Sequence, residues 1–526
     1  MPKDPNGTFV FGAAGAPETF DPLYATDGET FRISEQLFEG LVGFKPGTAD
    51  MEPSLAESWT HSDDGLTWDF KIRPNVTFTD GTPMNAEAAC YNLDRMYTQT
   101  GAGATQAEYW SLNMGGFKDQ KDENGKAVPS IYSSCTVKDD MTAEVKLTRY
   151  TSKFPAILGL PSYSMQSPTA LKKYDANDVK AQGDSFIYPA YATDHPTGTG
   201  PFELSKYDKQ NNTITLTRND NYWGQKAKVK TLIFQVIPDE TARKQALEAG
   251  TIDGYDLPNP GDWADLKSKG FQVDVRPAFN ILYLGFNFKN NPALKDLKVR
   301  QAIAYAMNRE QFVKTQLPEG AVVAKEFYPD TVDGWTDQVQ QYQYDPDKAK
   351  SLLKEYGKPV TLNFWWPTQV SRPYMPDPKS VFTAFSADLE AVGIKINATS
   401  KPWNGGYLDG VTAHQPDLFL LGWTGDYNTP DNFLGNFFSS PSTNNFDTAG
   451  ADFGNDLADA LAKADAIPDE DQRNAAYVDL NKKIMGDWLP GVPISSSPPA
   501  IVVAGDVKGL IPSPLTHELY SLVYKG

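Results

Sequence analysis

The stretch from Leu421 to Phe433 carries the residues best able to do chemistry in this chain. An apolar strand at 418–423 is predicted to run into a turn in which Gly425 precedes Asp426, and a helix is expected to follow. A carboxylate at a strand end is well placed to accept hydrogen bonds from an ammonium group. The alternative is a turn residue whose carboxylate caps its own backbone, and the local pattern alone favours that alternative.

Arg372 is the second candidate and would bind an anion. It lies between a predicted strand at 362–366 and a helix predicted to begin near Pro378. A guanidinium presents a planar fork that matches a carboxylate bidentately, which a lysine cannot do. The alternative is a surface arginine paired with Asp377, so both interpretations stay open on local grounds.

The sequence has no recognisable catalytic or metal-binding motif. It lacks a glycine-rich phosphate loop ending in Lys-Ser/Thr, a Gly-x-Ser-x-Gly elbow and a His-Glu-x-x-His pair. Asp426 and Asp431 could act as a glycosidase pair, but 67 acidic residues make chance pairs of this kind expected. The four histidines stand singly, without metal-ligand spacing: His61, His195, His414 and His517. We therefore predict no enzyme, no metal and no cofactor, with a carboxylate-based hydrolase as the rival interpretation.

Cys90 and Cys135 are the only two cysteines. They can form one disulfide, which would close a loop of about 46 residues and stabilise the fold by roughly 4 kcal/mol in the chain-entropy model. The alternative is a pair of buried thiols, and the spacing alone does not choose between the two.

The elements that position these residues are short strands mixed with helices. Residues 67–72 alternate as a half-buried strand should, and 200–204 with 213–217 predict a hairpin. N-cap residues, closing glycines and apolar stripes predict further helices at 85–93, 240–249, 346–357, 299–307 and 382–392, with a strand at 394–396. The pattern indicates α/β units in several lobes.

Length and charge bound the class of protein. A chain of 526 residues exceeds one hydrophobic core, so two or three lobes are expected. The formal charge of −19 repels phosphate backbones and anionic lipid, which argues against nucleic acid as a partner and against direct membrane docking. No apolar run approaches the ~20 residues of a membrane span.

Residues 1–7 lack the features of a secretory signal, so the chain is either cytoplasmic or an exported protein whose signal segment is absent from this sequence.

Short motifs recur in a fixed order along most of the chain. They are Pro17–Pro22, Phe38–Leu41, Pro53–Trp59, Asp64–Trp68, Phe78–Pro83, Asn85–Glu87, Gly198–Phe202, Asn219–Gly224, Val299–Ala306 and Asp345–Ala349. In this order they resemble the extracellular solute-binding proteins of the peptide/nickel family, which serve ATP-binding-cassette (ABC) importers. Each motif is weak alone, and the shared order carries the resemblance.

The resemblance implies an α/β, two-lobed periplasmic-binding-protein-like fold, with mixed sheets flanked by helices and a hinge between the lobes. Lobe I is expected to comprise 1–49, 188–275 and 496–526. An additional subdomain at 50–187 would be inserted into lobe I, and lobe II would comprise 276–495.

The resemblance also implies export, either to a periplasm or to the outer face of the cell membrane through a lipid anchor. Both cysteines would then lie within the inserted subdomain. Because thiols do not persist well in oxidising compartments, the export interpretation favours the disulfide between Cys90 and Cys135.

The family's dipeptide binders give the candidate residues their expected roles. The segment around Asp426 resembles the element whose aspartate holds the peptide's α-amino group, and Ser371–Tyr374 resembles the segment whose arginine binds the carboxylate. Two extended residues span only ~7 Å, so an Asp and an Arg at that separation would read peptide length. The other residues expected at the ligand are Trp423, Thr424, Gly425 and Trp403.

The family's oligopeptide binders carry arginines after the equivalent of Trp403, and the run 404–412 here has none. This difference favours di- and tripeptides. The expected partners are the peptide and the transmembrane permease of an ABC importer, and a monomer is expected. The alternative ligand for the same fold is a metal chelate, haem or an oligosaccharide.

Overall fold

The computed structural model describes residues 4, 6–122, 124–182 and 185–526. A few positions of the predicted lobe I (1–3 and 5) and of the predicted insertion (123, 183 and 184) therefore lie outside the described residues, as do the side chains of 185, 404 and 405. The chain forms two compact units. The first contains the residues up to Pro258 together with Asp262–Arg276 and Ala500–Gly526, and the second contains Asn259–Gly261 and Pro277–Pro499. The finer division into lobe I and an inserted subdomain stays a prediction.

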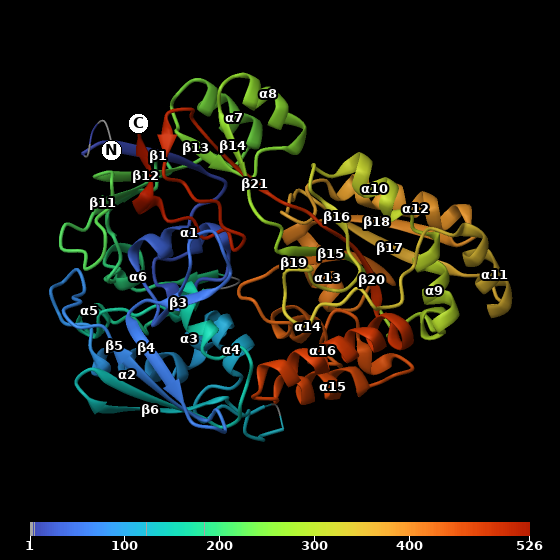
Figure 1. Cartoon of the computed structure of the whole chain (residues 1–526), viewed down its shortest axis with the longest axis horizontal. Helices are drawn as coiled ribbons and strands as arrows, with labels where there is room; N and C mark the ends of the chain where they lie inside the picture. The colour runs from blue at the N-terminus through green and yellow to red at the C-terminus, as the bar shows by residue number, and fades with distance from the viewer. Residues whose placement is uncertain (1–3, 5, 123, 183–184) are drawn as a thin grey trace. The chain divides into compact units, whose positions relative to one another are not determined.

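The first unit is built on a seven-stranded mixed sheet with the order β10-β11-β12-β1-β13-β21-β14 (Figure 1). β1 pairs in parallel with β12 and β13, whereas β21 is antiparallel to both of its neighbours. The strands are β1 (Thr8–Ala13), β10 (Phe202–Asp208), β11 (Thr213–Arg218), β12 (Thr231–Val236), β13 (Gly254–Asp256), β14 (Gln272–Val275) and β21 (Ala500–Val503).

Both faces of this sheet are covered, because alternate residues of a strand point to opposite sides. Phe9 and Phe11 of β1 pack in one core cluster with Ile33 of α1 and with Tyr520 near the C-terminus. Val10 packs on the other cluster, which contains residues of α7 and α8. The helices are α1 (Gly28–Leu37), α6 (Ala190–Asp194), α7 (Glu240–Glu248) and α8 (Trp263–Ser268).

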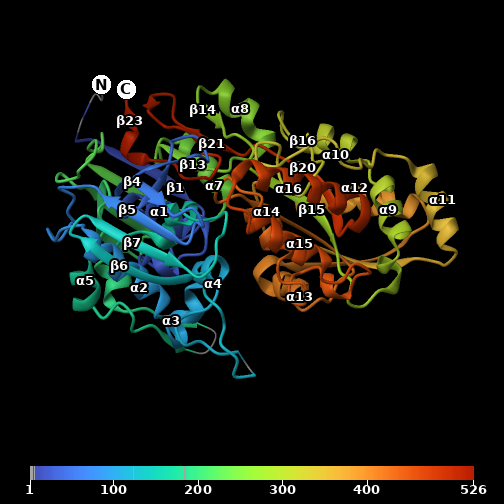
Figure 2. The same ribbon diagram turned by 60° about the horizontal axis from the view of Figure 1, so that its bottom comes forward.

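A second, four-stranded antiparallel sheet in the same unit has the order β4-β5-β7-β6, and α2 packs beside it (Figure 2). Cys90 of α2 and Cys135 of β6 form a disulfide. The elements are β4 (Ala56–His61), β5 (Thr67–Ile72), β6 (Tyr132–Asp139), β7 (Thr142–Leu147), α2 (Ala86–Tyr97), α3 (Gly101–Gln106), α4 (Glu108–Met114) and α5 (Pro168–Lys173). Three two-stranded ribbons complete the unit: β2 (Val42–Phe44) with β3 (Met51–Pro53), β8 (Lys180–Gln182) with β9 (Ser185–Ile187), and β22 (Val507–Lys508) with β23 (Tyr524–Lys525).

Partly buried polar side chains bring three of the sequence motifs together at Glu39. Its carboxylate accepts hydrogen bonds from the Thr199 hydroxyl (2.7 Å), the Tyr222 hydroxyl (2.6 Å) and Trp223 Nε1 (2.8 Å). Burial raises the pKa of Glu39, and these three donors lower it in part. The motifs at 38–41, 198–202 and 219–224 therefore share a structural role in this unit.

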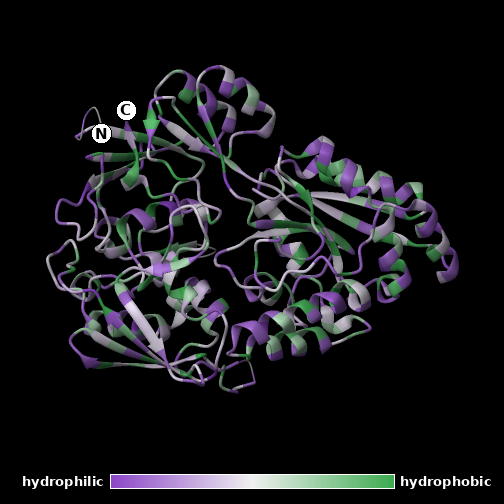
Figure 3. Cartoon of the chain, viewed as in Figure 1, coloured by the Kyte–Doolittle hydropathy of each residue, from purple (hydrophilic) through white to green (hydrophobic). Residues whose placement is uncertain are grey.

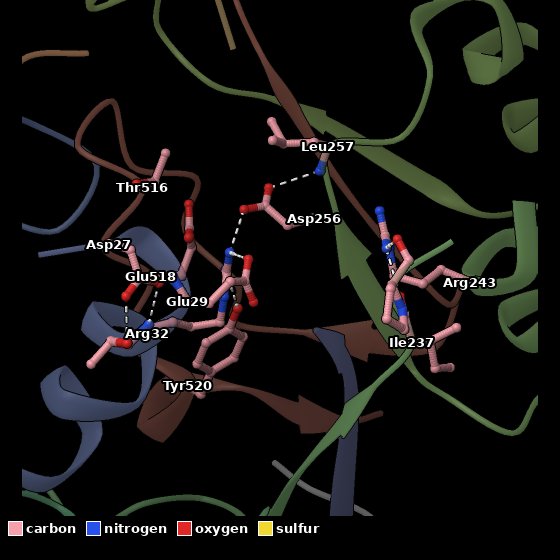
Figure 4. A network of polar contacts seen from close by, with 12 residues as sticks. Asp27, Glu29, Arg32, Ile237, Arg243, Asp256, Leu257, Thr516, Glu518 and Tyr520 are labelled. Atoms are coloured by element: carbon pink, nitrogen blue, oxygen red, sulfur yellow. Dashed lines mark hydrogen bonds and ion pairs between the residues drawn. The ribbon is translucent and has the colours of Figure 1, made fainter. Parts of the chain in front are cut away.

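A buried ion network joins α1, β13 and the C-terminal segment (Figure 4). Arg32 Nη2 lies 2.5 Å from Asp256 Oδ2, and Arg276 contacts both Asp256 Oδ1 (2.6 Å) and Glu518 Oε1 (2.7 Å). Burial alone would raise the pKa of Asp256, but the guanidiniums of Arg276 and Arg32 outweigh it and hold that pKa well below its usual range. The network stabilises contacts between segments more than 200 residues apart in sequence.

The second unit is built on a six-stranded mixed sheet with the order β16-β20-β15-β19-β17-β18. β15 and β20 are buried along their whole lengths, while the flanking helices carry hydrophilic as well as hydrophobic residues (Figure 3). The strands are β15 (Asn280–Phe286), β16 (Val322–Val323), β17 (Thr361–Thr368), β18 (Lys395–Pro402), β19 (Leu418–Thr424) and β20 (Gly491–Ser496). The helices are α9 (Leu297–Ala306), α10 (Arg309–Gln316), α11 (Pro346–Tyr356), α12 (Pro378–Ala391), α13 (Leu408–Thr412), α14 (Asp431–Phe438), α15 (Asp456–Asp465) and α16 (Glu470–Lys483).

The local signals for helix ends are confirmed in these elements. Asn85, Asp239 and Asp345 each accept a hydrogen bond from a backbone N–H in the first turn of the helix they precede. Gly250 and Gly357 follow two of these helices with φ of 71° and 78°, a left-handed conformation that favours glycine. The α/β class, with mixed sheets flanked by helices, is as predicted.

Candidate ligand-binding site

Three neighbouring strands of the second unit point in the same direction and end at one edge of the sheet. β17 pairs in parallel with β18 on one side and with β19 on the other. Asp426 lies two residues beyond β19, Arg372 lies four residues beyond β17, and Trp403 directly follows β18. The candidate residues therefore gather at the carboxyl ends of parallel strands, which is where α/β sheets commonly bind ligands.

The turn that carries Asp426 needs a glycine before it. The Gly425 N–H donates to the Phe279 carbonyl oxygen at 2.8 Å. A Cβ atom on Gly425 would lie 2.2 Å from Phe279 Cε1 and 2.9 Å from Phe433 Cζ, so any side chain would displace these rings or the turn. The close approach fixes the backbone immediately before the candidate carboxylate.

Asn432, on α14, holds both Asp426 and Trp423. Its Oδ1 accepts the Asp426 backbone N–H at 2.7 Å and the Trp423 Nε1–H at 3.3 Å. Its Nδ2 donates to Asp426 Oδ2 at 3.2 Å. The Asn432 side chain is buried, whereas Asp426 and Trp423 are half-buried. Sequence reasoning missed Asn432, and the available signal was an amide in the first turn of the helix expected after Asp426.

Arg372 is half-buried and stacks on an aromatic ring. Its guanidinium carbon lies 4.7 Å from the centroid of the Trp403 ring, a cation–π distance. It forms no ion pair with any residue that the structure describes. Asp377, the alternative partner, instead caps α12 by accepting the backbone N–H of Lys379 at 3.1 Å. The positive charge of Arg372 is therefore available to an anion.

Tyr374 seats the Arg372 segment on the strand that leads to Asp426. A Cβ atom on Gly422 of β19 would lie 2.5 Å from Tyr374 Cδ2, so the tyrosine ring packs directly on this glycine. Burial raises the pKa of Tyr374, and the charge of Arg372 lowers it in part. Tyr374 therefore remains a neutral phenol whose ring positions the two candidate segments on adjacent strands.

The remaining predicted residues occupy different environments. Trp403 is buried and stacks on Tyr407, with ring centroids 5.9 Å apart. Tyr407 in turn donates to the Leu420 carbonyl oxygen of β19 at 2.8 Å. Thr424 is half-buried at the last position of β19, where it pairs with Asn280. Trp403 is thus part of the packed support beneath Arg372, and a direct ligand contact for Trp403, Trp423, Thr424 or Gly425 stays a prediction.

The histidines have structural partners rather than metal-ligand neighbours. The His61 ring packs at a tilt against Trp68, and the His195 ring stacks on Tyr174. His414 forms a hydrogen bond with the Asn444 carbonyl oxygen, and His517 pairs with Glu35. Within the described ranges, no three or more His, Cys, Asp or Glu side chains are grouped so that they could hold a metal ion. A helix of a length and apolarity suited to crossing the bilayer is also absent from the described part of the chain.

A family model and individual relatives both match most of this chain. Residues 50–445 match the family described as bacterial extracellular solute-binding proteins, family 5 Middle. The chain is 32% identical to a dipeptide-binding protein of Escherichia coli over 518 residues, covering 97% of this chain and 92% of that protein. It is 30% identical to Heme-binding protein A of Haemophilus influenzae, covering 98% of this chain and 92% of that protein.

A solved structure resembles the whole chain. It is an ABC transporter-associated periplasmic binding protein from Helicobacter pylori, in complex with the peptide STSA. The TM-score is 0.79 at 26% identity, and the match covers 99% of this chain and 98% of that one.

Proposed function

Because the chain belongs to the bacterial extracellular solute-binding proteins of family 5, we propose that it captures di- and tripeptides outside the membrane and delivers them to the permease of an ABC importer. Membership of this family makes the chain the substrate-binding component of such an importer, an extracytoplasmic protein and not an enzyme. The peptide ligand, its length and its manner of binding are the proposed part.

The observation that carries the proposal is the pair of opposite charges at one sheet edge. Asp426 lies just beyond the end of β19 and is held by Asn432. Arg372 lies just beyond the end of β17 and has no ion-pair partner among the described residues. A short peptide at neutral pH carries an ammonium group at one end and a carboxylate at the other. Asp426 would accept hydrogen bonds from the ammonium, and Arg372 would bind the carboxylate bidentately.

Peptide length follows from the same arrangement. Two extended residues span ~7 Å and three span ~10 Å, so fixed partners for both ends admit only a narrow range of lengths. Free amino acids would reach only one of the two charges. Selectivity for the peptide's side chains is expected to be weak. Pockets that accept many different side chains are expected to be roomy and hydrated, and water molecules can bridge the remaining polar contacts at little cost in free energy.

Delivery requires that the ligand be enclosed and later released. We propose that the two units act as lobes that close on the peptide, and that the protein works as a monomer. In the cell it would reside in a periplasm or be lipid-anchored to the outer face of the membrane.

A different solute bound by the same fold is the second candidate. The relative named Heme-binding protein A, at 30% identity, favours haem over other non-peptide ligands. Haem binding would need a large apolar surface and an axial ligand, and all four histidines here already have structural partners. A metal chelate or an oligosaccharide is a weaker alternative on the same grounds.

The experiment that tests the proposal has two arms. Mass spectrometry of the molecules that co-purify with the protein should identify peptides of two or three residues. Calorimetric titration should then give saturable binding of a dipeptide panel, and none of haemin, a nickel chelate or a maltooligosaccharide. Binding of any of these three without binding of any dipeptide would refute the peptide proposal and leave the family intact.

A further inference from the structure

A cavity of about 130 Å³ lies in the second unit beside the start of α10. It approaches the size of engineered apolar cavities of about 150 Å³ that hold a benzene molecule. The lining residues that matter here are Met307, Arg309, Ala324, Tyr342, Tyr344 and Met485. Tyr344 is 46% exposed, whereas the other five are buried. The exposed Gln340, Gln341 and Gln343 also line the cavity, so it combines a mainly apolar interior beside Arg309 with a rim that is aromatic and polar.

Arg309 is the unusual member of this lining. Only 8% of its surface is exposed, and its hydrogen-bond acceptors are neutral carbonyl oxygens. Nη1 donates to Ala324 (3.0 Å) and Pro493 (2.6 Å), and Nη2 donates to Tyr342 (2.7 Å). In the described part of the chain, no carboxylate lies within ion-pairing distance of this guanidinium. A buried charge without a counter-charge is costly, so the site is electrostatically incomplete.

The guanidinium also has donors to spare. Of its five N–H groups, three are used by the three carbonyl oxygens, and Nε–H and one Nη2–H have no acceptor among the described residues. Burial lowers the pKa of Arg309 to about 10, which still leaves it charged at neutral pH. Two unused donors are the number that a carboxylate accepts from arginine bidentately.

The other charged residues in the lining are Lys325 and Glu310. Lys325 is half-buried, with its ammonium 5.6 Å from the centroid of the Trp335 ring. Glu310 is exposed; burial has the larger effect on the pKa of Arg309 and lowers it, whereas the charge of Glu310 raises it in part. The lining therefore carries one excess positive charge, and the buried charge is the positive one.

We propose that this cavity is a second binding site, for a small carboxylate carried on a short apolar or aromatic group. Arg309 binds the carboxylate, and the apolar group packs against Met307, Met485 and the rim tyrosine Tyr344. The site is separate from Asp426 and Arg372 in sequence and in its lining residues. It does not depend on the peptide proposal.

Benzoate is a suitable probe, because it joins a carboxylate to a ring of the size the cavity can hold. Benzamide has the same shape without the charge. Calorimetric titration should show saturable one-to-one binding of benzoate and binding of benzamide at least about tenfold weaker. The titration should be repeated in Arg372→Gln, which removes the other arginine that could bind a carboxylate, and the benzoate affinity should not change.

Two substitutions in the cavity test its location. Ala324→Leu fills the cavity, and Arg309→Gln removes the charge while keeping a donor for the carbonyl oxygens. Each should weaken benzoate binding at least about tenfold, with folding checked by circular dichroism. Lys325→Gln, at a half-buried position, should weaken benzoate binding only about threefold.

A structure of the full chain with 4-bromobenzoate keeps the proposal testable if a cavity variant fails to fold. The anomalous signal of bromine should lie in the cavity beside Arg309. Bromine found only elsewhere, benzoate binding that disappears in Arg372→Gln, equal affinity for benzamide, or the absence of saturable benzoate binding would each overturn the proposal.

Discussion

At the scale of single residues, the proposed site depends on a carboxylate whose orientation is fixed by its neighbours. Asn432 receives the Asp426 backbone N–H and returns a hydrogen bond to the Asp426 carboxylate, so both the main chain and the side chain of Asp426 are oriented. Pre-organised groups lose little freedom on binding, which raises affinity without any additional contact. Arg372 is restrained in a comparable way by its stacking on Trp403.

Asp426→Asn removes the negative charge while keeping the shape of the side chain. Dipeptide affinity should fall by about 2–5 kcal/mol, because the peptide's ammonium group would be desolvated without a counter-charge. Calorimetry measures the change, and Asp409→Asn, at an exposed position on α13, serves as the control. An unchanged affinity would mean that Asp426 is only a turn residue.

Asn432→Ala tests the positioning role directly. Dipeptide affinity should fall by about tenfold, and the emission of Trp423 should shift, because the three hydrogen bonds of Asn432 to Asp426 and Trp423 are lost at ~0.5–1.5 kcal/mol each. Asn436→Ala is the matched control: it lies one turn further along the same helix, and among the described residues its Nδ2 donates to the Asn432 carbonyl oxygen and not to Asp426 or Trp423. Equal affinities in the two variants would rule out a positioning role for Asn432.

At this scale the sequence proposed the charged residues of the candidate site but not the residues that support them. Asp426 and Arg372 each had a structural alternative on local grounds, and the resemblance to the family's dipeptide binders gave them their expected binding roles. Asn432 and Tyr374 were not predicted, because an amide in a helix and a tyrosine after a proline give no local sign of what they touch. Their contacts exist only once β17, β19 and α14 have packed together.

At the scale of elements, the site is produced by the direction of three strands. β17 lies between β18 and β19 and is parallel to both, so the segments that follow these three strands emerge at one edge of the sheet. The individual elements were predictable from periodicity and caps: β5 and α11 begin at the predicted residues. Strand order was not predictable in this way, because pairing joins β17 to β19 across more than fifty residues of chain.

Gly425→Ala tests the turn between β19 and α14. The added methyl group would meet the rings of Phe279 and Phe433, so the turn should shift, with a stability loss of ~1–3 kcal/mol and a clear loss of dipeptide affinity. The control is Gly28→Ala, where nothing beyond the adjacent residues and the backbone of its own helix lies within 4 Å of the added carbon. If Gly425→Ala binds dipeptides as tightly as the unaltered protein, the turn does not position Asp426.

At the scale of the whole molecule, pH dependence of stability is expected from one buried acid in the second unit. Burial raises the pKa of Glu326 to about 9, while its hydrogen bond from the Thr336 backbone N–H lowers the pKa in part. Glu326 is fully buried, and Oε2 has no partner among the described residues. The local sequence does not predict the burial of Glu326, because a Lys-Glu pair is typical of an exposed surface.

The sign of the effect follows from linkage. The folded protein keeps the Glu326 proton up to about pH 9, whereas the unfolded chain loses it near its ordinary pKa of about 4.3. The stabilisation from this proton is complete below about pH 4.3 and is lost as the pH rises towards 9, by at most about 1.4 kcal/mol per pH unit.

Glu326→Gln should therefore raise the melting temperature at pH 8 and leave it nearly unchanged at pH 4.5. Thermal unfolding followed by circular dichroism measures both values. Glu319→Gln, at an exposed position nearby, should have no effect at either pH. A lower melting temperature for Glu326→Gln at pH 8 would show that the carboxylate is stabilised by its surroundings, contrary to the expectation.

The family and the α/β class were predictable for the whole molecule because motifs spread along most of the chain carry them. The structure gives three of these motifs a physical role, since they meet at Glu39. The ligand was less predictable, because relatives of similar identity are named for dipeptides and for haem.

The central claim is that Asp426 recognises the free amino end of a short peptide. A calorimetric cycle tests it most directly, with dialanine and N-acetyl-dialanine titrated into the unaltered protein and into Asp426→Asn. Acetylation should weaken binding by at least about tenfold in the unaltered protein and by much less in the variant. Acetylation removes the positive charge of the peptide's amino group, and in Asp426→Asn the carboxylate that pairs with this charge is already absent. An equal effect of acetylation in both proteins, or no binding of dialanine to either, would contradict the claim.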